Sequence, residues 1–268
     1  ALSATDEERE RSENLDVGYD PEERTWELIV RHSGSLAGLA GAGIQVDELL
    51  NGYAVLVVPE HLMDQVSELN QIEYIEKPKR LFFASNMARA ASCLSVVQSP
   101  SGTGNVTGGI ISGLSGGLTG RGVLVAVIDS GIDYLNQDFR NEDGSTRILM
   151  LMDQDRGRIY TREEINEALD APDRAGALER VPSVDLSGHG TAVAAIAAGN
   201  GRGSQGVYRG VAYESDLLVV KLGAPLADNF PRTTQLMKGL DFVIRQAQEL
   251  GRPVAVNLSF GNTYGSHD

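Results

Sequence analysis

The stretch Val125-Ala126-Val127-Ile128-Asp129-Ser130-Gly131 decides the fold of the larger part of this chain. Together with Val123 and Leu124 it forms an apolar run without polar alternation, which predicts a strand buried on both faces in a parallel sheet. Asp129 ends that run, and functional groups of open α/β sheets gather at the carboxyl ends of the strands. The alternative is that Asp129 only caps a turn or a helix.

Downstream of Gly131, apolar and amphipathic segments alternate. We expect strands at 148–152, 217–222 and 253–260, and helices at 163–169, 191–198 and 230–250. Strands that alternate with helices predict an α/β domain with a parallel sheet, here over residues 121–268.

The N-terminal third has a different pattern. Residues 1–23 are charged and lack periodicity, which indicates a flexible leader. Four short apolar segments follow, with the hairpin signal Asn51-Gly52 and a helical pattern after Pro59, and they predict a small α+β domain over residues 24–80. Residues 99–120 are rich in glycine and serine, and we interpret residues 81–120 as a linker and processing region.

The composition excludes several classes of function. A formal net charge of -14 argues against a nucleic-acid-binding protein, because phosphate binding needs a basic face. Cys93 is the single cysteine, which excludes a disulfide framework and a multi-cysteine zinc site. No apolar run approaches the ~20 residues that a membrane span needs. The first twenty residues hold no signal peptide, and a targeting segment lost before Ala1 stays open.

A second segment with chemical potential surrounds His189. It reads Asp185-Leu186-Ser187-Gly188-His189-Gly190-Thr191, and it opens an alanine-rich helix. An imidazole is the natural general base near neutral pH, and flanking glycines leave it open to a substrate. The alternative is a structural histidine.

These segments, with the strand pattern that ends in Ser259-Phe260-Gly261, together resemble the subtilisin family of serine proteases. The resemblance implies that Asp129 is the acid of an Asp-His-Ser triad and that His189 is its general base. It also implies that Ser259, Phe260 and Gly261 pair with the backbone of a protein or peptide substrate as an added strand. The expected function is therefore a hydrolase, a serine endopeptidase.

The N-terminal domain is similar to the propeptide of that family, which implies a zymogen with the propeptide bound to its catalytic domain. Segments such as 74–81, Asp133-Tyr134 and 143–148 resemble the clostridial spore germination proteases and related gut-bacterial subtilases. This narrower resemblance implies an extracellular or spore-associated protein. No cofactor is expected. Many subtilases bind calcium, however, and Asp138 with the loop 200–206 matches ligand positions of some of them.

One part of the family pattern is missing. The Gly-Thr-Ser-Met-Ala-x-Pro segment that carries the nucleophile does not occur in this sequence, and neither does the oxyanion asparagine segment. We expect sequence downstream of Asp268 to supply the serine, as a C-terminal remainder of the same protease. Two alternatives stay open: a catalytically inactive relative that acts as a binding or regulatory protein, and a stable fragment without activity.

Overall fold

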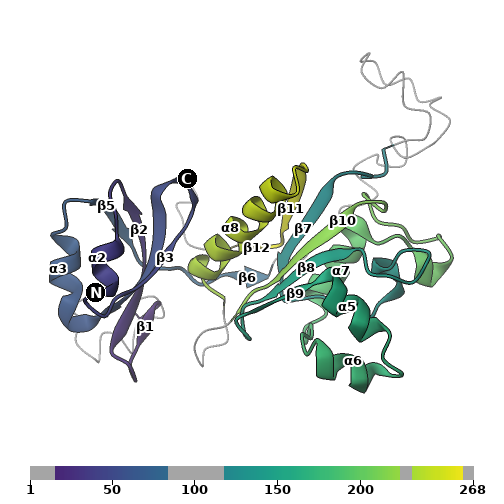
Figure 1. Ribbon diagram of the computed structural model, residues 1–268, viewed down its shortest axis with the longest axis horizontal. Coiled ribbons are helices and arrows are strands. Elements are labelled where there is room, and N and C mark those ends of the chain that lie inside the picture. The colour runs from purple at the N-terminus through teal and green to yellow at the C-terminus, as the bar shows by residue number, and fades with distance from the viewer. Residues whose placement is uncertain (1–15, 84–117, 224–230, 262–268) are drawn as a thin grey trace, which may run out of the picture. The chain divides into compact units, whose positions relative to one another are not determined.

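The computed structural model describes residues 16–83, 118–223 and 231–261 (Figure 1). The chain divides into two compact units, each described here by itself. Of the described residues, the first contains 16–82, 231–241 and Gly261, and the second contains Phe83, 118–223 and 242–260. Within the described ranges, no helix is long and apolar enough to cross a membrane.

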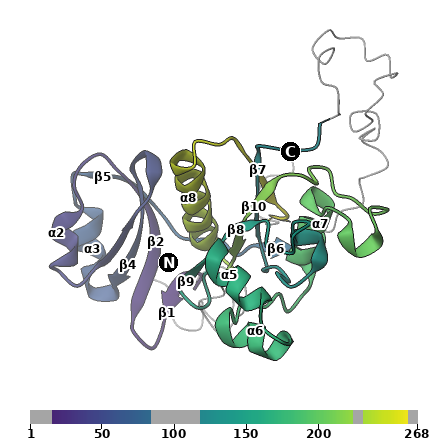
Figure 2. The same ribbon diagram turned by 45° about the vertical axis from the view of Figure 1, so that its right-hand side comes forward.

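The first unit is built on an antiparallel sheet with the strand order β1-β2-β4-β3, in which β5 pairs with β2. The strands are β1 (Tyr19–Asp20), β2 (Thr25–His32), β3 (Gln45–Glu48), β4 (Tyr53–Pro59) and β5 (Ile72–Glu76). Helices α2 (Ala37–Ala40) and α3 (Met63–Ser67) cover one face, as Figures 1 and 2 show. The core between them contains Trp26, Leu28, Val30 and Leu56.

The expected leader needs one correction. Tyr19 and Asp20 form β1 and pair with Trp26 and Thr25, and Val17 is buried. The Tyr19 ring also packs on Trp26, with ring centroids 4.8 Å apart. The small domain therefore begins before residue 24. The first fifteen residues of the expected leader, and most of the expected linker, lie outside the described residues.

The second unit contains a mixed five-stranded sheet with the order β11-β7-β10-β8-β9. Its strands are β7 (Leu124–Asp129), β8 (Ile148–Asp153), β9 (Arg158–Thr161), β10 (Asp216–Lys221) and β11 (Val254–Leu258). All neighbours are parallel except β9, which pairs antiparallel with β8. Helices α5 (Arg162–Leu169), α6 (Arg174–Arg180) and α7 (His189–Ala198) belong to this unit, as do residues 242–249 of α8 (Thr233–Glu249), whose earlier residues are assigned to the first unit.

Burial explains why the central strands are apolar throughout. Every residue of β7 is buried, and Val125 and Val127 share one core with α5, α6 and α7. Leu124, Ala126 and Ile128, which point to the opposite face, are just as inaccessible. The predicted α/β class, preceded by a small α+β domain, is confirmed.

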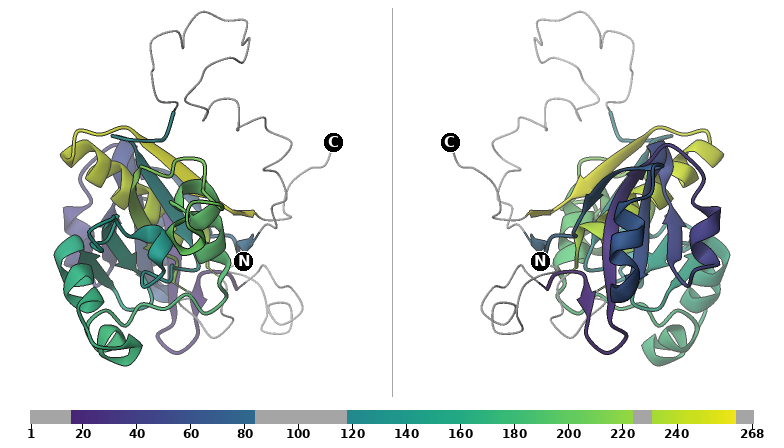
Figure 3. Two further views of the ribbon diagram at one scale, coloured as in Figure 1. Left: turned by 90° about the vertical axis from the view of Figure 1, so that its right-hand side faces the viewer. Right: turned by 90° about the vertical axis from the view of Figure 1, so that its left-hand side faces the viewer.

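The sequence did not indicate β9 or α6, both of which are short and polar. The chain turns from β9 into α5 through a capping box, in which Thr161 and Glu164 satisfy each other's backbone N–H groups. Helices α5 and α6 then pack together beside the sheet (Figures 2 and 3). A last two-stranded sheet pairs β6 (Phe82–Phe83) with β12 (Phe260–Gly261).

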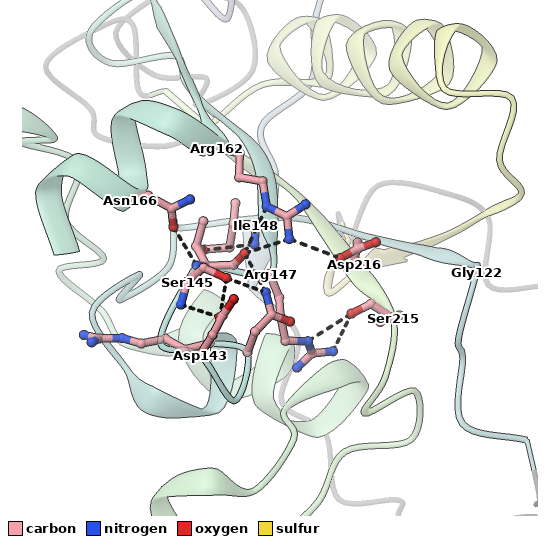
Figure 4. Close-up of polar contacts among 12 residues, drawn as sticks. Gly122, Asp143, Ser145, Arg147, Ile148, Arg162, Asn166, Ser215 and Asp216 are labelled. Atoms are coloured by element: carbon pink, nitrogen blue, oxygen red, sulfur yellow. Dashed lines mark hydrogen bonds and ion pairs between the residues drawn. The ribbon is translucent and has the colours of Figure 1, made fainter. Parts of the chain in front are cut away.

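A buried arginine ties the ends of several elements together (Figure 4). Arg147 is 3% exposed, and its guanidinium donates to the carbonyl oxygens of Ser215 at 2.5 and 3.1 Å and of Ala198 at 2.7 Å. It also donates to the carbonyl of Asp138 at 3.1 Å. Burial lowers the pKa of Arg147 from its usual value. The guanidinium therefore joins the start of β10 to the last turn of α7.

Candidate active site

The structure brings Asp129 and His189 together. Asp129 is the last residue of β7 and is fully buried, whereas His189 is the first residue of α7 and has a side chain that is 23% exposed. The Nδ1 atom of His189 lies 2.8 Å from Oδ1 of Asp129, which is hydrogen-bond distance. The two residues are sixty positions apart in the sequence, and the fold places the start of α7 beside the end of β7.

The carboxylate of Asp129 has a second donor that fixes its direction. The backbone N–H of Ser130 donates to the same Oδ1 atom at 2.7 Å. An ionised carboxylate only accepts hydrogen bonds, so it requires the proton of His189 to stand on Nδ1. In that tautomer the other ring nitrogen carries a lone pair, which is what a general base needs.

The glycines that flank His189 have different roles. Gly188 adopts a left-handed conformation with φ of 73° directly before the helix. Gly190 allows a close approach, since a Cβ atom there would stand 2.1 Å from the carbonyl oxygen of Gly131. Sequence reasoning assigned both glycines to access for a substrate. In the structure, Gly190 instead permits α7 to touch the turn that follows β7.

Asp185 was not singled out from the sequence, yet it accepts most of the hydrogen bonds around the pair. Its carboxylate accepts hydrogen bonds from Ser130, Gly188 and Thr191. Burial raises its pKa, but these hydrogen bonds outweigh burial and hold the pKa below its usual value. The signal available in the sequence was an acidic residue shortly before a helix start that also contains a threonine. Between Asp185 and Ser187, Leu186 is 91% exposed.

The expected substrate-binding strand follows β11. Ser259 is buried and its hydroxyl accepts a hydrogen bond from the Asn257 side chain at 2.8 Å. Phe260 and Gly261 form β12, whose backbone pairs with β6. A role of these three residues in binding a substrate stays a prediction.

The oxygens expected from the resemblance as calcium ligands have hydrogen-bond partners within the protein, and calcium binding at Asp138 stays a prediction. Oδ1 of Asp138 accepts the backbone N–H of Gly203 at 2.7 Å, and the carbonyl of Asp138 accepts the guanidinium of Arg147. The side-chain oxygen of Asn200 likewise accepts the N–H of Arg202. Among the described residues, no group of three or more histidine, cysteine, aspartate or glutamate side chains could hold a metal.

Comparisons with known proteins find relatives of both parts of the chain. Residues 120–268 match the model of the subtilase family, and residues 1–79 match that of the Csp protease B prodomain. The chain is similar to the CspB protease of Clostridium perfringens, with 41% identity, a TM-score of 0.52, and coverage of 56% of this chain and 31% of that one.

A second solved structure shows likeness of fold alone. Fervidolysin of Fervidobacterium pennivorans, a keratinolytic enzyme related to subtilisin, has 15% identity, a TM-score of 0.50, and coverage of 90% of this chain and 36% of that one. The chain thus spans about a third of the length of both solved structures. Since the family model covers more than half of its residues, the chain belongs to the subtilase family.

Proposed function

We propose that this chain is the N-terminal part of a serine endopeptidase of the subtilisin type. The observation that carries the proposal is the 2.8 Å contact between the buried carboxylate of Asp129 and Nδ1 of His189. His189 accepts the proton of a serine hydroxyl as that oxygen attacks a peptide carbonyl, and then gives it to the leaving amine. Asp129 holds the productive tautomer and stabilises the imidazolium that forms.

The serine comes from sequence downstream of Asp268. Two observations support this proposal. This chain spans only about a third of the length of each solved relative, and an edge strand of the sheet lacks a second partner among the described strands. Among the described strands, β11 is paired on one side only, with β7. Val256 and Leu258 on that strand are 37% and 42% exposed, which is unusual for apolar residues of a parallel strand. A C-terminal remainder that pairs with this edge and packs on its face would cover them.

The N-terminal region acts as a propeptide. Its match to a prodomain model, ahead of a protease domain, supports an association between propeptide and catalytic domain and a protein or peptide as substrate. The similarity to a clostridial Csp protease supports an extracellular or spore-associated location. Immunodetection on intact spores, compared with culture supernatant and cell lysate, tests that location, and signal confined to the lysate would contradict it.

Active-site labelling tests the activity. A fluorophosphonate probe should label the complete protease, and the His189→Ala variant should react at least a thousandfold more slowly, because the serine has lost its base. A matched His61→Ala variant, changed on the separate prodomain, should label at the wild-type rate.

The same experiment separates the alternative. An inactive relative that serves as a binding or regulatory protein would leave the complete protein unlabelled, with or without its prodomain. The retained hydrogen bond between Asp129 and His189 favours the enzyme.

A further inference from the structure

We propose that Asp185 is a positioning residue that holds the Asp129–His189 pair in its reactive geometry. The inference deepens the proposed function and rests on it. Asp185 touches neither member of the pair through its own side chain in any described contact. It acts through two branches, one to the helix that carries His189 and one to the turn that follows Asp129.

The first branch fixes the start of α7. Oδ2 of Asp185 accepts the backbone N–H of Thr191 at 2.8 Å and its hydroxyl at 2.7 Å. Oδ1 accepts the backbone N–H of Gly188 at 3.0 Å. Gly188 directly precedes the helix and Thr191 is its third residue, so one carboxylate secures the turn that begins with His189.

The second branch reaches the acid of the pair. The hydroxyl of Ser130 donates to Oδ1 of Asp185 at 2.8 Å and accepts the backbone N–H of Gly190 at 2.9 Å. The backbone N–H of the same Ser130 donates to Oδ1 of Asp129, the atom that His189 contacts. A single residue, Ser130, therefore links the Asp185 carboxylate to the orientation of Asp129.

Ser187 strengthens the connection between the branches. Its hydroxyl lies 2.8 Å from Oγ of Ser130 and 3.2 Å from Oδ1 of Asp185. It also accepts the backbone N–H of His189 at 3.1 Å. The turn after β7 and the loop before α7 are thus joined by a continuous network with Asp185 at its centre.

The network requires a carboxylate at position 185. All four groups bonded to it from Ser130, Gly188 and Thr191 are donors, so both of its oxygens must accept. An asparagine would offer one oxygen and would turn its NH₂ group toward N–H donors on the other side. In a half-buried site that leaves donors unsatisfied. A negative charge is also favourable at the N-terminus of the ten-residue helix α7.

The test is the Asp185→Asn substitution in the complete protease. We expect kcat to fall roughly tenfold to hundredfold, because small displacements of catalytic groups have effects of that size. KM should change less than about twofold, since Asp185 makes no contact with the proposed substrate strand. The low-field proton resonance of His189 Nδ1–H, assigned by its loss in His189→Ala, should shift or broaden.

Asp173 provides a matched control. Its side chain caps α6 by accepting the N–H of Gly176 at 2.8 Å, in the same way that Asp185 caps α7, but Asp173 has no described contact with the pair. Asp173→Asn should leave kcat, KM and the His189 resonance unchanged. Ser130→Ala removes the second branch together with the acceptor of the Gly190 N–H, while Asp185 still accepts from Gly188 and Thr191; it should reduce kcat and disturb the same resonance.

Two results would overturn the inference. One is wild-type kcat in Asp185→Asn. The other is a lower kcat that follows a loss of folded protein while the His189 resonance keeps its position. If Asp185→Asn does not fold, Ser130→Ala decides, and an unchanged resonance in that variant contradicts the link. Failure of the proposed function is distinguishable, because the complete wild-type protein would then hydrolyse no peptide, whereas the resonance is measured without turnover.

Discussion

At Asp129, two hydrogen bonds converge on one carboxylate oxygen, from a backbone amide and from an imidazole. The backbone amide sets the direction of the carboxylate, and the carboxylate then sets the tautomer of His189. The residue before the turn therefore governs the chemistry of a side chain sixty positions away.

Asp129→Asn should lower kcat of the complete protease by about 10⁴-fold, because an amide can turn its NH₂ group to the imidazole and favour the wrong tautomer. Steady-state hydrolysis of a chromogenic peptide measures the effect. Asp133→Asn, on the same turn and ion-paired with Arg174 at the surface, is the control. Equal activity of the two variants would remove Asp129 from the mechanism.

Gly190→Ala should abolish both activity and the native packing of α7. The added methyl would stand 2.1 Å from the carbonyl oxygen of Gly131, so the helix or the turn must move. Gly157→Ala is a suitable comparison, since its φ of 59° is strained but nothing lies within 4 Å of the new methyl. The control should cost about 1 kcal/mol, as for a residue forced into a left-handed conformation. Urea unfolding and peptide hydrolysis give both values.

The Asp185 carboxyl also predicts a dependence of stability on pH. Its pKa is lower in the folded protein than in the unfolded chain. The ionised carboxyl therefore stabilises the folded state, and this contribution is complete above the pKa of the unfolded carboxyl, about 3.9. That contribution is lost as the pH falls through the lower folded pKa. The difference in free energy of unfolding between the parent and Asp185→Asn, both in a His189→Ala background that prevents self-digestion, should be constant above about pH 5 and shrink toward pH 2. A difference that grows on acidification would contradict the sign.

At the scale of elements, the strands and long helices were predictable and the connections between them were not. β7 and β10 were predictable because each contains an uninterrupted apolar run that is buried on both faces, Leu124 to Ile128 in β7 and Leu217 to Val220 in β10. β9 and α6 escaped prediction because Arg158, Arg174 and their polar neighbours show no periodic apolar face. The role of Asp185 was not predicted for a different reason. The sequence gives its residue type and its spacing from His189, but not which hydrogen-bond donors the fold brings to its carboxylate.

Arg147 donates to backbone carbonyls of three separate segments, at Asp138, Ala198 and Ser215. Arg147→Met should destabilise the catalytic unit by about 3 kcal/mol or more, because three backbone carbonyls lose their buried donor. Arg158→Met is the matched control, since that side chain is 56% exposed and pairs with Glu164 at the surface, which is worth less than about 1 kcal/mol. Urea unfolding in the His189→Ala background compares the two, and equal losses would show that the Arg147 hydrogen bonds contribute little.

For the whole molecule, the strand order places β7 inside the sheet and β11 at its edge within the described part of the chain. If a C-terminal remainder covers that edge, backbone amides of β11 should exchange with deuterium much more slowly in the complete protein than in the 268-residue chain. Amides of β7, paired on both sides, should change little. Equal exchange of β11 in both proteins would mean that nothing pairs with it.

The exposed Leu186 gives the site a practical consequence. Its neighbours in the chain, Asp185 and Ser187, are anchored by hydrogen bonds, while its own side chain is 91% exposed. Within residues 1–268, Leu186→Cys in a Cys93→Ser background leaves one thiol, which can carry a fluorophore three residues before His189. We expect the fluorescence of such a dye to change when a peptide binds beside His189, so that binding could be followed in real time; an unchanged signal on adding peptide would contradict this.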